Sequence, residues 1–211
     1  MAKTKWVYFF GGKKAEAGEK LRNLVGGKGA GLADMVNLGI PVPPGFTITT
    51  EACVYFYQNN MAFPEGLKEQ VIENMKKVEK VMGMGFGDQK NPLLFSVRSG
   101  ARVSMPGMMD TVLNLGLNDK TVKGLATLTG NERFAYDCYR RFVQMYGDVV
   151  LGLKPKEKDE RDPFEEIIEA KKKEKKVEFD TDLTVDDLKD LVALFKKLIK
   201  TRLKVSFPED P

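Results

Sequence analysis

The sequence predicts an α+β protein, because β-type and helical patterns fall in different parts of the chain. Residues 1–118 mix short β-type runs, glycine-rich turns and helical patterns, whereas residues 119–205 are helical in pattern. Residues 206–211 resemble the start of a return segment that is cut short. With 211 residues, of which 42% are hydrophobic and 30% charged, the chain is long enough for one large or two small domains with their own core.

Composition narrows the possible functions. The net charge of +4 arises from 34 Lys and Arg against 30 Asp and Glu, without a basic stripe, so we expect no nucleic-acid partner. The chain contains no histidine, which excludes Ser-His, Cys-His and His-metal chemistry within these residues, and we expect no metal-ligating residue among them.

The two cysteines and the apolar runs bear on location. Cys53 and Cys138 lie among apolar residues without metal-ligand spacing, so both are expected to be ordinary core thiols. The apolar run near the N-terminus is too short for a signal peptide, and no run reaches the ~18 residues of a membrane span. These observations predict a cytoplasmic protein with no membrane partner.

Several elements of residues 1–92 are readable from local patterns. Trp6–Phe10 predicts a strand, and the extended Ile40–Gly45 connector leads to a second strand at Phe46–Thr49. Thr50 is a candidate cap for a short helix, and residues 66–82 carry an apolar stripe at helical spacing.

A glycine-rich run, Gly26–Gly31, contains Lys28 and precedes a helical pattern that Gly39 would terminate. A glycine loop entering a helix presents free N–H groups to a phosphate, and a lysine adds charge. The spacing matches neither G-x-x-x-x-G-K-[ST] nor G-x-G-x-x-G. Two readings therefore remain open: a phosphate loop, or a tight turn that packs a helix on a sheet.

A predicted hairpin occupies Leu93–Asp119. Leu93–Val97 is patterned as a buried strand that ends at Arg98, and Thr111–Leu115 is a second strand-like run. The small residues between them would form an anion-binding tip, although Arg98 could equally form a salt bridge at the strand end.

The remaining residues predict helices. Asn131 can cap a helix whose apolar residues recur every four positions at 134, 138, 142, 146 and 150. Asp162-Pro163 is a good helix start, and the Lys171–Lys176 run is expected to be a solvated helix face. Thr184 opens a last helix with an apolar stripe at residues 188, 191, 195, 198 and 199.

Three motifs together resemble a known family. Its members are the dikinases that transfer phosphate from ATP to a histidine, which include pyruvate, phosphate dikinases and phosphoenolpyruvate synthases. The motifs occur in the family's order and are NLVGGKG at residues 23–29, PPGFT at 43–47 and SVRSGA at 96–101. Residues 104–119, 131–150 and 179–191 also look like the pyruvate, phosphate branch. The synthase branch typically has an acidic stretch and a glutamine-bearing tip where this chain has Met105–Met109.

The resemblance implies an ATP-grasp-like fold that clamps Mg-ATP between two subdomains. Residues 1–118 would be part of a nucleotide-binding subdomain, carrying the glycine-rich run and the phosphate-binding hairpin, and residues 119–205 a helical subdomain. Lys28 and Arg98 match the family's phosphate-binding cations. The other implied ATP-binding residues are Gly27, Gly29, Ser99, Gly100, Ala101, Met105 and Gly107.

The departures from the family pattern imply a fragment. The phosphate-accepting histidine cannot lie in a chain without histidine, and the Mg²⁺ ligands and the pyruvate-binding barrel are expected outside these residues. Pyruvate and phosphate would act through those absent domains. By this resemblance the full-length enzyme is a homodimer and the fragment alone is inactive. Two alternatives remain: a phosphoenolpyruvate synthase-type dikinase, or a non-catalytic nucleotide-binding module.

Overall fold

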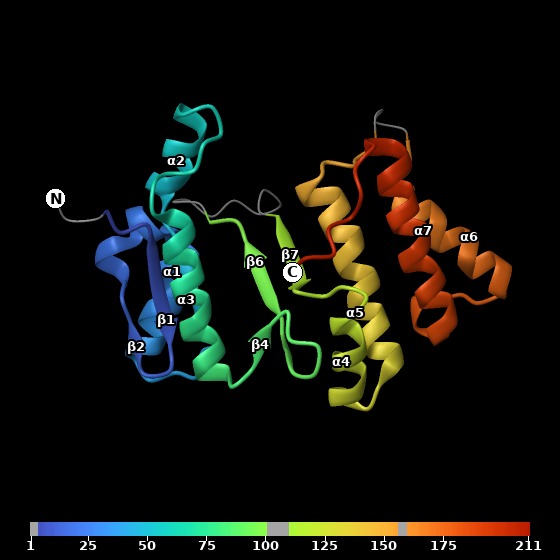
Figure 1. Cartoon of the computed structure of the whole chain (residues 1–211), viewed down its shortest axis with the longest axis horizontal. Helices are drawn as coiled ribbons and strands as arrows, with labels where there is room; N and C mark the ends of the chain where they lie inside the picture. The colour runs from blue at the N-terminus through green and yellow to red at the C-terminus, as the bar shows by residue number, and fades with distance from the viewer. Residues whose placement is uncertain (1–3, 101–109, 156–159) are drawn as a thin grey trace. The chain divides into compact units, whose positions relative to one another are not determined.

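The computed structural model describes residues 4–100, 110–155 and 160–211, which form two compact units. Unit 1 contains residues 4–84 with Ser99 and Gly100, and unit 2 contains Gly85–Arg98 and residues 110–155 and 160–211. Both combine helices with small sheets, so the expected α+β class is confirmed (Figure 1). The predicted domain boundary at residue 118 stays a prediction.

Unit 1 contains a three-stranded sheet in the order β2-β1-β3, with both pairs antiparallel. The predicted first strand is β1, Val7–Gly11, which turns directly into β2, Lys14–Ala15. The second predicted strand is β3, Gly45–Ile48. It pairs with β1 from Val7, opposite Ile48, to Phe10, opposite Gly45.

Four helical segments accompany this sheet: η1 (Glu19–Leu21), α1 (Arg22–Asn37), α2 (Thr50–Gln58) and α3 (Leu67–Met82). Helices α1 and α3 both pack against β1 and β3, and α2 packs against α1. Gly39 terminates α1 as expected: its φ is +78°, its N–H donates to the carbonyl of Val36, and that of Ile40 donates to Met35.

Two predictions about α2 are wrong. Thr49, and not Thr50, is the N-terminal cap of α2: its hydroxyl accepts from the N–H of Ala52 at 3.2 Å. Cys53 is exposed instead of buried, because Ala52 is the residue of α2 that points into the core.

Unit 2 contains the predicted hairpin. Strand β6, Phe95–Arg98, is antiparallel to β7, Thr111–Leu115, with Arg98 opposite Thr111. Two shorter strands, β4 (Gly85–Phe86) and β5 (Pro92–Leu93), pair in parallel. The expectation of a buried strand is corrected for β6, whose residues from Ser96 to Arg98 are exposed, whereas Val112 of β7 is buried.

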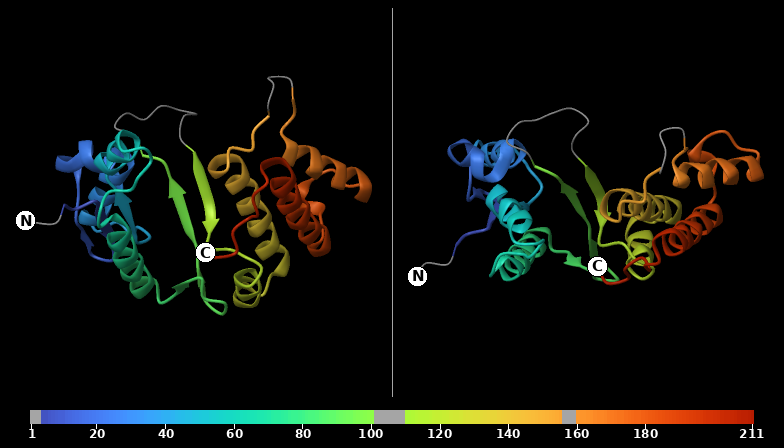
Figure 2. Two further views of the ribbon diagram at one scale, coloured as in Figure 1. Left: turned by 45° about the horizontal axis from the view of Figure 1, so that its top comes forward. Right: turned by 90° about the horizontal axis from the view of Figure 1, so that it is seen from above.

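The helices of unit 2 are α4 (Thr121–Thr129), α5 (Glu132–Met145), α6 (Pro163–Lys175) and α7 (Val185–Leu203), with a π turn η2 at Tyr146–Val150 and a 3₁₀ turn η3 at Asp180–Asp182. Helix α5 packs against α4 and α7, and α6 packs against α7, as Figure 2 shows. Asn131, Asp162 and Thr184 cap α5, α6 and α7 as predicted. No helix within the described ranges is both long and apolar enough to cross a membrane.

The core of unit 2 confirms one predicted stripe and corrects another. Leu188, Leu191, Phe195 and Ile199 of α7 are fully buried. However, Phe134 of α5 is 47% exposed and Val150, at the end of η2, is 52% exposed, and the buried apolar residues of α5 are Ala135, Tyr139, Phe142 and Val143. A strict spacing of four advances about 40° round the helix at each step, so its ends leave the buried face.

The lysine run on α6 is partly structural. The Lys171 side chain is only 9% exposed and pairs with Glu174 at 3.0 Å and Asp190 at 3.4 Å. Lys172 pairs with Glu169 and Asp180. Lys173, Lys175 and Lys176 are exposed. The prediction of a solvated face is therefore correct for the end of the Lys171–Lys176 run and wrong for its start.

The start of α7 generates a prediction about pH. The buried Asp187 carboxylate accepts from the hydroxyl and the N–H of Thr184, at 2.6 and 3.0 Å, and pairs with Lys175 at 3.1 Å. The Thr184 bond, with further help from Lys175, holds the pKa of Asp187 below its ordinary 3.8. A carboxylate whose pKa is lower in the folded than in the unfolded chain stabilises the fold at pH values above its unfolded pKa. That contribution is lost as the pH falls through its folded pKa. Asp187→Asn should therefore lower the free energy of unfolding at pH 7 by about 1 kcal/mol.

The measurement is urea unfolding followed by circular dichroism at pH 7 and well below pH 3.8. The control is Asp186→Asn, because Asp186 lies in the same helical turn with its side chain 94% exposed. The difference between Asp187→Asn and the native chain should shrink at the lower pH, and Asp186→Asn should be nearly neutral. An equal loss for both variants would contradict the assignment.

A second prediction concerns the packing of α1 on β3. A Cβ at Gly29 would lie 2.9 Å from Oγ1 and 3.0 Å from Cγ2 of Thr47, whereas a Cβ at Gly31 would meet nothing within 4 Å. Gly29→Ala should therefore destabilise the chain by about 1–3 kcal/mol through overpacking. Gly31→Ala should be neutral or stabilising, by up to about 1 kcal/mol.

Thermal unfolding of both single variants and of Gly29→Ala/Thr47→Ala provides the measurement. The double variant removes both crowding atoms and should recover much of the loss. Equal behaviour of Gly29→Ala and Gly31→Ala would show that the close approach does not limit packing.

Candidate functional site

The glycine-rich run lies within helix α1 and not in a loop before it. The helix is interrupted at Gly26, which is buried and has φ 73° and ψ 168°. This conformation is accessible to glycine and strained for other residues. The chain is helical on both sides of the break, so the expectation of a loop is corrected to a kinked helix that restarts at Gly27. A helix that starts anew presents N–H groups without intrahelical acceptors in its first turn, as a phosphate site requires.

Gly27, Lys28 and Gly29 form the turn that follows the break. The Lys28 side chain is exposed and forms no ion pair or hydrogen bond with another residue of the described ranges. Gly29 is buried with its Cα against Thr47 of β3. The two hypotheses for this run, helix packing and phosphate binding, thus apply to neighbouring residues. Gly29 packs the helix on the sheet, and Lys28 is available to an anion.

Arg98 is the last residue of β6, and its side chain is exposed. Within residues 4–100, 110–155 and 160–211 it forms no salt bridge, so the alternative reading of Arg98 as a salt-bridge former finds no support there. Ser99 and Gly100 follow it and are also exposed. Ala101, Met105 and Gly107 lie outside the described residues.

The predicted site residues divide between the two units. Gly27, Lys28 and Gly29 are brought together by α1 in unit 1, to which Ser99 and Gly100 also belong, whereas Arg98 belongs to unit 2. Each cation is therefore available within its own unit, and their action on one ligand stays a prediction. Among the residues that the structure describes, no group of three or more His, Cys, Asp or Glu could hold a metal ion.

A cluster in unit 2 was missed by the sequence analysis. The Lys196 ammonium contacts Asp119 at 2.9 Å and Glu209 at 2.5 Å, and the Tyr139 hydroxyl donates to Asp119 at 3.0 Å. Burial, reinforced by the Asp119 carboxylate, raises the pKa of Tyr139 above its ordinary range. The cluster joins positions 77 and 90 residues apart along the chain, so local spacing carried no signal for it. Its groups bind one another, which makes it a structural cluster.

Buried Arg140 was also missed. It donates to Asp137 at 2.6 Å and to Gln144 at 3.2 Å, with Asp180 at 3.5 Å. Asp137 and Gln144 lie three residues before and four residues after it, which is the available sequence signal for a charged pair on one helical face. Arg140 thereby ties α5 to the η3 turn.

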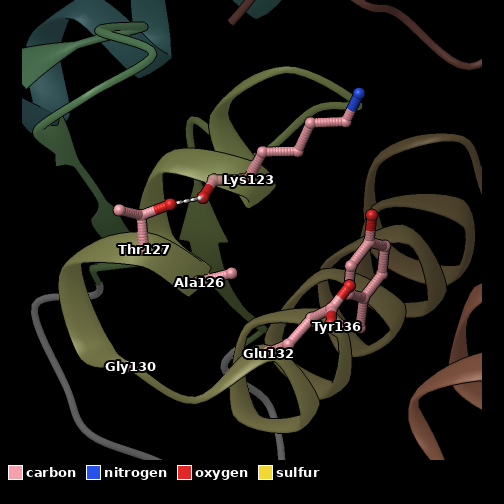
Figure 3. Close-up of a pocket in the computed structure, with 6 residues that line it drawn as sticks. All are labelled: Lys123, Ala126, Thr127, Gly130, Glu132 and Tyr136. Carbon is pink, nitrogen blue, oxygen red and sulfur yellow. Dashed lines mark hydrogen bonds between the residues drawn. The ribbon is translucent and has the colours of Figure 1, made fainter.

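An open depression of about 410 Å³ lies between α4 and α5 (Figure 3). Its lining residues are Lys123, Ala126, Thr127, Gly130, Glu132 and Tyr136. The Glu132 carboxylate is already paired with Lys189 at 2.8 Å. None of the predicted site residues lines the depression, so it does not compete with Lys28 and Arg98 as a phosphate site.

Comparisons with known proteins bear on this site directly. Residues 22–65, which include Gly27–Gly29, match the family model described as "Pyruvate phosphate dikinase, AMP/ATP-binding domain". Along 99% of its length the chain is 53% identical to the pyruvate, phosphate dikinase of Clostridium symbiosum and 51% identical to that of Giardia intestinalis. It is 49% identical over 98% of its length to the chloroplastic pyruvate, phosphate dikinase 1 of Zea mays.

The match covers nearly all of this chain but less than a quarter of each relative. The chain is covered almost completely, yet it spans 23%, 23% and 21% of these three relatives. The similarity includes both α1 and the β6–β7 hairpin, which are the two elements that carry the predicted cations. The chain is therefore a homologue of the N-terminal AMP/ATP-binding region of pyruvate, phosphate dikinases.

Proposed function

We propose that this chain is the ATP-binding part of a pyruvate, phosphate dikinase, in an ATP-grasp-like domain. Such an enzyme converts ATP, phosphate and pyruvate to AMP, pyrophosphate and phosphoenolpyruvate through a phosphohistidine. The observation that carries the proposal is the identity of about half of all residues along nearly the whole chain, with a family-model match at the α1 break. Lys28 and Arg98 support it, because both are exposed and neither forms an ion pair with another residue that the structure describes.

Lys28 and Arg98 would act electrostatically on the phosphates. The lysine is a compact charge beside the first-turn N–H groups after Gly26, and the arginine offers a planar fork that can bind two phosphate oxygens. As a phosphoryl group moves, negative charge spreads over its oxygens, and fixed cations stabilise that charge. Each such contact contributes about 1.5–3 kcal/mol, or one to two decades in rate or affinity.

The other groups of the reaction would lie elsewhere in the enzyme. The phosphate-accepting histidine is outside this chain, which has none. Magnesium bound with ATP neutralises phosphate charge, and the described residues contain no cluster of ligands to which it can be assigned. Pyruvate and phosphate binding, dimerisation and the cytoplasmic location belong to the same proposal; the maize relative is named chloroplastic.

The nearest rival reaction is that of a phosphoenolpyruvate synthase, which uses water in place of phosphate. The relatives reported above are pyruvate, phosphate dikinases, which favours the reaction that uses phosphate over the one that uses water. Dependence of the full-length reaction on added phosphate separates the two.

A third prediction concerns Arg98→Ala in a full-length dikinase that contains this chain. Loss of the guanidinium should slow phosphorylation of the carrier histidine by about one to two decades, because one charged contact is lost. The exchange between phosphohistidine and pyruvate should be unchanged. Rapid-quench measurement of each half-reaction provides the test.

Two further variants sharpen this experiment. Arg98→Lys keeps the charge but loses the fork, so it should recover part of the rate. Arg161→Ala removes an exposed arginine of unit 2 and should have no effect. Equal losses in both half-reactions for Arg98→Ala would point to a folding defect and against a phosphate contact.

A fourth prediction concerns the 211-residue chain alone. Since only part of the nucleotide site is proposed to lie in it, calorimetric titration with Mg-ATP should show weak or undetectable binding. Any heat that is detected should be lost in Lys28→Ala and kept in Lys13→Ala, an exposed lysine of the β1–β2 turn. Tight binding would contradict the view that the site is incomplete.

A further inference from the structure

The carbonyl of Asn23, in the first turn of α1, is bound by a residue of another helix. In an unbroken α-helix this carbonyl would accept from the N–H of Gly27, four residues further on. That pairing spans Gly26, where α1 leaves helical geometry. The hydroxyl of Thr50, the first residue of α2, donates to the Asn23 carbonyl at 2.8 Å. The carbonyl beside the break thus has a donor that does not belong to α1.

The hydroxyl of Thr50 is free for this contact because its neighbour caps α2. The Thr49 hydroxyl accepts from the N–H of Ala52, and the Thr49 N–H donates to the carbonyl of Trp6 at 2.9 Å. Thr49 is 1% exposed, and Ala52 lies in the core of unit 1. The first turn of α2 is thereby attached to that core, which gives the Thr50 hydroxyl a defined position beside α1.

The contact bears on the N–H groups that follow the break. Because glycine adopts helical angles as readily as a positive φ, Gly26 permits the break but does not enforce it. If the helix closed across Gly26, the Asn23 carbonyl would take the N–H of Gly27 and withdraw it from a ligand. The Thr50 hydroxyl competes with that helical bond for the same carbonyl. It therefore stabilises the interrupted form of α1, in which N–H groups are available to an anion.

We propose that Thr50 is a positioning residue of the nucleotide site. Its hydroxyl holds the Asn23 carbonyl and so keeps the Gly26 break open, which leaves the N–H groups of the following turn to the phosphates of ATP. The inference rests on the proposed function and extends it to a residue that acts through α1. Asn23 and Thr50 both lie within residues 22–65, the stretch that matches the AMP/ATP-binding family model.

The test is single-turnover phosphorylation of the carrier histidine at a series of Mg-ATP concentrations, in a full-length dikinase that contains this chain. Thr50→Val removes the hydroxyl and keeps the shape of the side chain. The half-saturating concentration of Mg-ATP should rise by about two- to tenfold, which corresponds to one neutral hydrogen bond. Thr50→Ser keeps the hydroxyl and should restore the native value. An unchanged half-saturating concentration in Thr50→Val, or a rise of equal size in Thr50→Ser, would overturn the proposal.

A folding defect has a different signature. It reduces the amount of active enzyme, so it lowers the maximal rates of histidine phosphorylation and of phosphohistidine–pyruvate exchange together, without changing the half-saturating concentration of Mg-ATP. The matched control is Thr127→Val on α4 of unit 2, where the Thr127 hydroxyl donates to the carbonyl of Lys123 at 3.0 Å. This variant should keep the native half-saturating concentration. A rise as large as that of Thr50→Val would show that the effect is not specific to the α1 break.

The inference and the proposed function can fail separately. If Arg98→Ala slows histidine phosphorylation but Thr50→Val leaves the half-saturating concentration unchanged, the proposed function stands and the role of Thr50 is refuted. If Thr50→Val raises that concentration while Arg98→Ala has no effect, the role of Thr50 stands and the Arg98 contact is refuted. Absence of any histidine phosphorylation by Mg-ATP in the native full-length enzyme would refute both.

Discussion

The close approach of α1 to β3 at Gly29 is the constraint on which the candidate site depends. The Thr47 side chain of β3 lies so close that a side chain at position 29 would displace it, so glycine lets the helix lie there without overpacking. Because Gly29 faces the sheet, the neighbouring Lys28 faces outward. The break at Gly26 then gives this face of the helix a new N-terminal turn. One contact thus fixes both the position of the helix and the direction of its lysine.

Local chemistry made much of the fold predictable. Asn131, Asp162 and Thr184 were identified as caps because their side chains accept from N–H groups two or three residues on, which spacing alone reveals. The hairpin followed from two β-type runs around small residues. The predicted α5 stripe is wrong at its ends because a strict spacing of four drifts round the helix, and the prediction for Cys53 is wrong because apolar neighbours along the chain do not by themselves bury a side chain.

The candidate site was predictable to a smaller extent. Lys28 and Arg98 emerged from motifs of consecutive residues, and the structure leaves both exposed and unpaired within the described ranges. Whether glycine serves a phosphate or a neighbouring strand depends on Thr47, which lies 18 positions further along the chain. Pairings of this kind, like that of Lys196 with Asp119, arise from tertiary packing and leave no local pattern.

The last residues of the chain are held by several side chains at once. Phe207 packs its ring against Tyr139, Phe142 and Tyr146, and Glu209 engages Lys196 and the backbone N–H of Asp119. Lys204, at positive φ, turns the chain back from the end of α7 toward these partners. Residues 205–211 are therefore attached at Phe207 and Glu209 to α5, to α7 and to Asp119, just before α4. Detaching this segment would expose the Tyr139 and Phe142 rings and leave Lys196 without one of its two carboxylate partners.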